Sequence, residues 1–146
     1  MSENEAIKPF YIKEKILDMM KYGNRALQHF PWREKALAEE IKANMYRLLY
    51  QAIRVEKRYY KKTTLQELDI EIDVLRHNLR LAHDPDYYNE QVPKRGRNGR
   101  IVKGPDGKPI MVKIQPPLPP RKYEQWSRLL DEIGRMVGGY IKTARQ

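Results

Sequence analysis

The sequence predicts an all-α fold, an antiparallel four-helix bundle with a Pro/Gly-rich β-hairpin insert between the third and fourth helices. Two observations predict it. Apolar residues recur every three or four positions along four long segments. Eight of the ten prolines and four of the eight glycines fall within residues 85–120, which therefore interrupt the helical part. Amphipathic helices with short connections pack as antiparallel bundles, so we expect a single domain over residues 1–146.

The first two helices are separated by Pro31, which cannot continue the helical hydrogen bonds. We expect helices over about residues 8–29 and 33–62. The inner stripe of the second helix consists of Ile41, Met45, Leu48, Ala52, Val55 and Tyr59. A second apolar line lies beside it and consists of Tyr46, Leu49, Ile53 and Tyr60. Together they cover about half of the helix circumference, which predicts contact with two helices or with another subunit.

The third and fourth helices are predicted over about residues 64–83 and 121–142. The third begins at the capping-box pattern Thr64-Leu65-Gln66-Glu67. The fourth contains three glycines, each of which costs about 1 kcal/mol relative to alanine inside a helix. We interpret Gly134 and Gly138 as positions that let another helix approach closely.

The insert at residues 85–120 contains two β-prone runs, residues 100–103 and 110–114, with Asp-Gly turn chemistry between them. A two-stranded ribbon is therefore predicted. An isolated hairpin is marginally stable, so we expect this one to rest on the bundle, a neighbouring subunit or a ligand. The prolines at 116–120 predict a stiff spacer before the fourth helix.

Composition excludes several classes of protein. The chain has no cysteine, so disulfides, thiol nucleophiles and cysteine zinc sites are excluded. Its three histidines do not converge and there is no phosphate-binding loop, so we expect no catalytic site, metal or cofactor. No apolar run approaches the ~20 residues of a membrane span. We expect a cytoplasmic protein that is not an enzyme.

The charge indicates a polyanionic partner. The net charge is +10, and residues 34–62 carry eight bases against four acids. Four of these bases fall on one side of the second helix and form a predicted basic ridge, with three flanking residues that add cations and a ring for stacking. The ridge is Arg47, Arg54, Arg58 and Lys61, flanked by Tyr50, Lys57 and Lys62. A second candidate is a glycine-rich basic loop with Lys94, Arg95, Arg97 and Arg100. The alternatives are a solvated helix face and a solubilising loop.

The most specific string is in the fourth helix, residues 127–142, and reads SRLLDEIGRMVGGYIK. It resembles the closing motif of the accessory variability determinant (Avd) family of diversity-generating retroelements. The Phe30-Pro31 break and residues 71–82 agree with that family, whereas the Pro/Gly-rich insert departs from its compact pattern.

The resemblance implies a non-catalytic four-helix-bundle protomer that assembles into a basic homopentamer. It implies partnership with the element's reverse transcriptase and with template RNA and cDNA, in the mutagenic reverse transcription that diversifies a target gene. Two other hypotheses remain open. One is an RNA-binding bundle of the type encoded in ribosomal-RNA intervening sequences. The other is an assembly scaffold whose charge serves only solubility.

Overall fold

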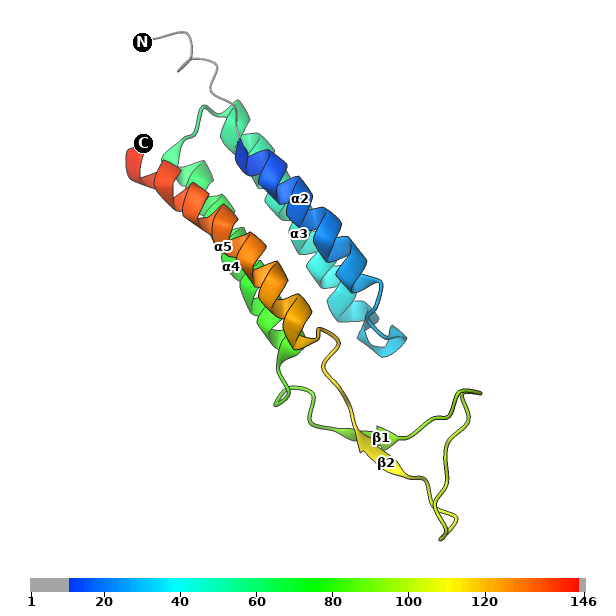
Figure 1. The fold of residues 1–146 in the computed structure, drawn as a ribbon. Helices are drawn as coiled ribbons and strands as arrows, with labels where there is room; N and C mark the ends of the chain where they lie inside the picture. The colour runs from blue at the N-terminus through cyan, green and yellow to red at the C-terminus, as the bar shows by residue number, and fades with distance from the viewer. Residues whose placement is uncertain (1–10, 145–146) are drawn as a thin grey trace.

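The computed structural model describes residues 11–144, which form four α-helices in an antiparallel bundle (Figure 1). The helices are α2 (Tyr11–Leu27), α3 (Lys35–Lys57), α4 (Lys62–His83) and α5 (Pro120–Thr143). Each helix packs against two others, in the cyclic order α2, α3, α4, α5. A 3₁₀ turn, η1 (Trp32–Glu34), follows Pro31 between α2 and α3. The predicted bundle is confirmed. The part of the first helix expected before Tyr11 lies outside the described residues.

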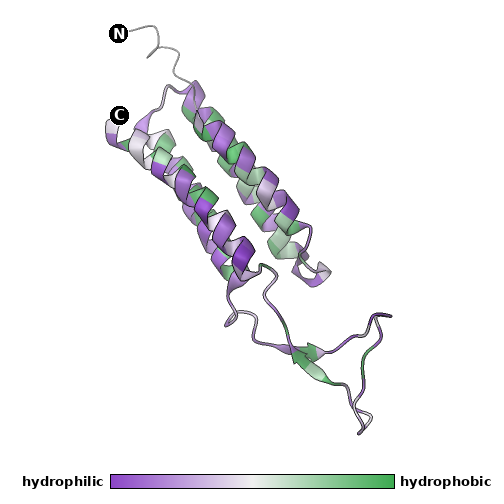
Figure 2. Ribbon diagram, in the orientation of Figure 1, coloured by the Kyte–Doolittle hydropathy of each residue, from purple (hydrophilic) through white to green (hydrophobic). Residues whose placement is uncertain are grey.

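The core is built from one stripe on each helix, as the periodicity predicts. Hydrophobic residues recur between hydrophilic ones along every helix in Figure 2. The buried members from α2 and α3 are Ile12, Ile16, Met19, Ala26, Ile41, Met45, Leu48, Ala52 and Val55. Those from α4 and α5 are Leu65, Leu68, Ile72, Leu75, Leu79, Ala82, Trp126, Leu130, Ile133 and Val137. Burial of this apolar area is the main favourable term in folding.

The indole of Trp126 on α5 fills the space next to Gly23 on α2, where a larger residue would place its side chain. A Cβ atom placed on Gly23 would lie 2.5 Å from Cζ2 of Trp126 and 2.7 Å from the sulfur of Met45. The indole N–H of Trp126 is directed at the sulfur of Met19, at 3.2 Å, and its ring meets Tyr22 edge-on. Gly23 therefore sets how closely α2 and α5 approach.

The connection between α3 and α4 differs from the prediction of a helix through residue 62. Helix α3 ends at Lys57, and Tyr59 and Tyr60 have φ angles of 54° and 60°. The left-handed conformation costs about 1–2 kcal/mol per non-glycine residue, so two in succession form a strained corner. The Tyr60 N–H donates to the carbonyl of Val55 at 2.9 Å, which closes the end of α3. Tyr59 was predicted on the inner stripe, and this is wrong because the helix ends before it.

The predicted capping box at Thr64 is also wrong. Helix α4 begins at Lys62, so Thr64 already lies inside its first turn, and its side chain is buried. The residue before the helix, Lys61, makes no side-chain capping hydrogen bond. The pattern failed because the corner at Tyr59 and Tyr60 places the helix start two residues earlier.

The insert contains a two-stranded antiparallel hairpin, as predicted, but with a different partner strand. Strand β1 (Gln91–Pro93) pairs with β2 (Met111–Lys113). The predicted strand at residues 100–103 takes part only in two isolated bridges, Arg95 with Ile101 and Lys103 with Pro109. It is divided between two tight turns, so it cannot pair along its length with residues 110–114.

The two turns are built alike, with the same contacts eight residues apart. The N–H of Gly96 donates to the carbonyl of Arg100, and that of Gly104 donates to Lys108, both at 2.9 Å. Each turn contains a glycine with positive φ, 78° at Gly99 and 76° at Gly107. Residues 96–102 and 104–110 thus form a short repeat that was not recognised in the sequence.

The base of the insert is attached to the bundle, whereas its ribbon extends beyond the bundle end (Figure 1). The Tyr88 hydroxyl donates to Oε1 of Glu34 at 2.6 Å, and the Leu118 N–H donates to the carbonyl of Ala82 at 3.1 Å. Burial and this bond to Glu34 raise the pKa of the Tyr88 hydroxyl, which keeps it protonated as a donor. Neither β1 nor β2 is packed against a helix of the described chain.

We predict that Gly23→Ala lowers the free energy of unfolding by about 2 kcal/mol, because the new methyl group overlaps the Trp126 indole. Gly139→Ala is the matched control on α5, where no atom lies within 4 Å of the added carbon. It should raise stability by roughly 0.5–1 kcal/mol. Urea unfolding measures both. A Gly23→Ala protein as stable as the wild type would contradict the close contact.

Candidate nucleic-acid interface

Five cations lie together where α3 ends and α4 begins, and we call them the basic corner: Arg54, Lys57, Arg58, Lys61 and Lys62. All are exposed except Lys62, which is half-buried. Within residues 11–144, none of the five has an ion-pair partner. The acid among them, Glu56, is 3.3 Å from the ammonium of Lys13 on α2. The corner therefore presents uncompensated positive charge.

Arg47, predicted as the first member of the ridge, is instead held by carboxylates. Its Nη2 donates to Oε1 of Glu40 and its Nε donates to Oε2 of Glu71, both at 3.1 Å. Burial would lower the pKa of Arg47, but the hydrogen bonds to Glu71 and Glu40 raise it above the ordinary value. The predicted ridge therefore loses Arg47, and its remaining members, Arg54, Arg58 and Lys61, lie where α3 ends and α4 begins.

The Arg47 pair belongs to a polar network between α3 and α4. Asn44 is fully buried, and its Nδ2 donates to both the carbonyl and Oε2 of Glu71. The Oδ1 of Asn44 accepts from Asn78 at 3.1 Å. Buried polar groups cost free energy unless they are hydrogen-bonded, so these contacts fix the register of α3 against α4. Arg47 therefore has a structural partner and is not available as a free cation.

Helix dipoles account for only part of the basic corner. Cations stabilise the carboxyl end of a helix, which suits Arg54 and Lys57 in the last turn of α3. Lys61 and Lys62 begin α4, where the dipole disfavours positive charge, and the first turn of α4 contains no acidic residue. Helix stability therefore does not explain these two lysines.

The two tyrosines of the corner point in different directions. Tyr60 is half-buried and stacks on Tyr140 of α5, with ring centroids 5.2 Å apart and planes at 7°. Tyr59 is 90% exposed and lies among the five cations in the sequence. Sequence reasoning did not select Tyr59, because helical periodicity assigned it to the core. The available signal was the run Arg58 to Lys62, in which two aromatic residues stand between cations.

The second basic candidate lies at the opposite end of the bundle, in the insert (Figure 1). Lys94, Arg95, Arg97 and Arg100 are all exposed. Arg95 donates to the carbonyl of Gly99 at 2.8 Å, within its own turn. The structure therefore does not bring the two sets of predicted cations together.

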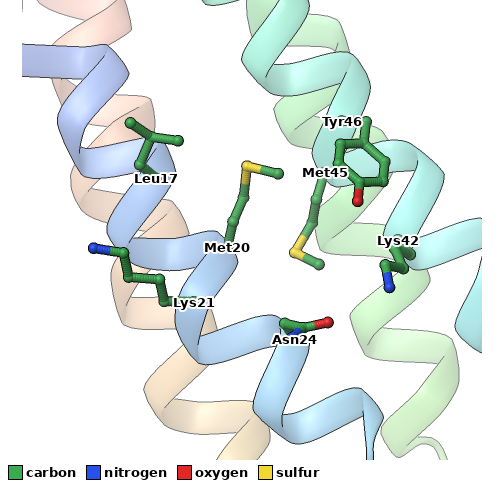
Figure 3. A pocket seen from close by; sticks show the side chains of 7 residues that line it. All are labelled: Leu17, Met20, Lys21, Asn24, Lys42, Met45 and Tyr46. Carbon is green, nitrogen blue, oxygen red and sulfur yellow. The ribbon is translucent and has the colours of Figure 1, made fainter.

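An uncovered apolar face runs along α2 and α3. A pocket between these helices is lined by Leu17, Met20, Lys21, Asn24, Lys42, Met45 and Tyr46, and Figure 3 shows Met20 and Met45 directed into it from opposite sides. Tyr46 and Ile53 are exposed, and Leu49 is half-buried. Tyr46 stacks on the predicted flanking residue Tyr50, with ring centroids 6.3 Å apart. Of the predicted second apolar line, Tyr46 and Ile53 are therefore not covered by the protomer's own helices, whereas Leu49 and Tyr60 pack against the core.

The glycines of α5 differ in their surroundings. The guanidinium of Arg76 on α4 lies where a side chain of Gly134 would be, and it is 3.5 Å from Asp131 and 3.6 Å from Asp73. A side chain of the same chain thus makes the close approach at Gly134. A carbon added at Gly138 would have no neighbour within 4 Å.

Residues 11–144 contain no group of three potential metal ligands, and no helix among them is long and apolar enough to cross a membrane. The Nδ1 of His77 donates to the carbonyl of Asp73 at 2.8 Å, and His83 stacks on Tyr123.

Comparison with known proteins gives one match. The family model described as bAvd-like matches residues 10–94, which is more than half of the chain. No curated protein and no solved structure matches. The matched region spans α2, α3 and α4 and includes the basic corner.

Proposed function

Because the chain belongs to the bAvd-like family, as its resemblance to Avd proteins predicted, we propose that it is a basic, oligomeric accessory subunit of a diversity-generating retroelement. The family is of an accessory, non-catalytic kind. In this role the chain binds the reverse transcriptase and the template RNA or its cDNA and supports mutagenic reverse transcription. The observation that carries the proposal is the basic corner, five cations without ion-pair partners in the described chain.

Electrostatics supports a polyanionic partner at the corner. Neutralising phosphates releases counterions, and each phosphate contact on a single strand contributes about 0.7 to the slope of log affinity against log salt. Arginine forms paired hydrogen bonds to phosphate, and lysine adds point charge. The net charge of +10 per chain would bring about 50 positive charges together in a pentamer.

The uncovered apolar face supports self-association. Tyr46 and Ile53 are exposed on α3, and Tyr46 lines the pocket together with Met20 and Met45. Apolar patches of this kind mark interaction surfaces on soluble proteins. We propose that a second copy covers this face, and that five copies close the assembly. Gly138, whose surroundings are open in the protomer, would allow a neighbouring helix to approach.

The first prediction concerns the corner. Charge reversal of Arg54, Arg58 and Lys61 to Glu should weaken RNA binding at least tenfold and reduce the salt slope by about 2, because three phosphate contacts are lost. The matched control reverses Arg121, Lys122 and Arg135 on α5 and should retain most of the affinity. Fluorescence anisotropy over a salt series measures both variants, after their mass in solution has been checked.

The outcomes separate the proposed function from its alternatives. Unchanged affinity and slope in the corner variant would exclude the corner as the RNA site. No binding of the wild type to RNA or DNA at low salt would favour the scaffold hypothesis. RNA binding without capture of the reverse transcriptase would favour the intervening-sequence type. Capture of the polymerase after nuclease treatment, lost in the corner variant, would assign the corner to the polymerase instead.

The second prediction concerns assembly. The wild type should have a mass of about 88 kDa by light scattering, five times the 17.5 kDa chain. Tyr46→Glu with Ile53→Glu should yield folded monomers, since both residues are exposed in the protomer. Ile70→Glu with Val74→Glu alters two exposed apolar residues of α4 and serves as the control. A monomeric wild type would contradict this part of the proposal.

A further inference from the structure

Tyr59 is the most exposed of the large apolar and aromatic side chains of the described chain, at 90%. Several other exposed aromatic residues have partners. The ammonium of Lys35 lies 4.5 Å from the ring centroid of Trp32, and Tyr87 packs edge-on against Tyr88. Tyr59 has no ring contact or hydrogen bond of its side chain within residues 11–144. Both faces of its ring are accessible.

Fold stability does not explain a tyrosine at this position. Its φ of 54° is the left-handed conformation, which glycine and asparagine adopt more readily than aromatic residues. Its ring gains almost nothing from burial, because the neighbouring Tyr60 makes the packing contact with Tyr140. The corner therefore holds an unburied aromatic ring in a conformation that disfavours it. A role outside the fold accounts for this arrangement better than a role within it.

The surroundings of the ring identify the chemistry that it fits. Arg58 precedes Tyr59, and Lys61 and Lys62 follow Tyr60, all of them without ion-pair partners in the described chain. A planar ring amid cations is the arrangement by which proteins bind single strands, with bases stacked on aromatic side chains and phosphates on the cations. Bases in the interior of a duplex already stack on each other and expose no face to such a ring.

We propose that Tyr59 is a stacking platform for an unpaired base of a single-stranded nucleic acid bound at the basic corner. The cations hold the phosphates and provide affinity that does not depend on sequence. The ring provides the preference for single strands over duplexes. This inference rests on the proposed function, because it requires that the corner bind nucleic acid.

The test uses the full chain and a labelled single-stranded oligouridine RNA. Tyr59→Asn should weaken binding about tenfold, the loss expected for one stacked base. The same substitution should leave the thermal midpoint unchanged or raise it, because asparagine tolerates the left-handed conformation. Tyr59→Phe should retain wild-type affinity, because the ring remains. Tyr87→Asn, at an exposed tyrosine of the insert, is the matched control and should bind like the wild type.

Two further probes identify stacking as the cause. An RNA of the same length with abasic positions should bind the wild type and Tyr59→Asn equally, because no base is present to stack. A duplex RNA should also show no difference between them. Equal weakening on single strand, duplex and abasic RNA would mean that the substitution disturbs the corner, and this result would overturn the platform.

The failures of the two proposals are distinguishable. If charge reversal of the corner abolishes RNA binding and Tyr59→Asn binds oligouridine like the wild type, the platform is wrong and the RNA site stands. If charge reversal has no effect, the RNA site itself is wrong. If Tyr59→Asn reduces capture of the reverse transcriptase and not RNA binding, the ring contacts protein, and the platform is again overturned.

Discussion

The tight corner formed by Tyr59 and Tyr60 determines most of what is distinctive in this molecule. Two successive left-handed residues end α3 at Lys57 and allow α4 to begin at Lys62. The strain, about 1–2 kcal/mol per residue, is opposed by the stacking of Tyr60 on Tyr140. The same geometry gathers the end of α3 and the start of α4 and turns Tyr59 outward. The cationic surface is thus a consequence of how the chain reverses direction.

The bundle could be predicted because its buried residues recur along the sequence with the period of a helix. Stripes such as Ile12, Ile16 and Met19 on α2 read directly as buried helix faces. The left-handed turn at Tyr59 and Tyr60 could not be predicted, because Tyr59 continues the apolar spacing of α3. Only its backbone conformation removes it from the helix. The partner of β2 was missed for a related reason. Residues 100–103 have strand propensity, but the two glycine turns on either side of them decide their pairing.

The excess of cations at the interface could be predicted from the sequence, but which of these cations are held in ion pairs could not. Counting residues located the excess of cations on the second helix, and four of the five members of the basic corner lie within residues 54–61. The sequence does not show that Glu71, on another helix, reaches Arg47. Nor does it show that the side chain approaching Gly134 is Arg76 of α4. Pairing across helices depends on their relative register, which only the fold establishes.

The account depends on the basic corner being the surface that meets nucleic acid. Photochemical crosslinking of the wild-type protein to thiouridine-substituted RNA, with the joined peptides identified by mass spectrometry, tests this most directly. The account predicts that the crosslinks concentrate within residues 54–62. Crosslinks confined to α5 or to the insert, with none at the corner, would contradict it.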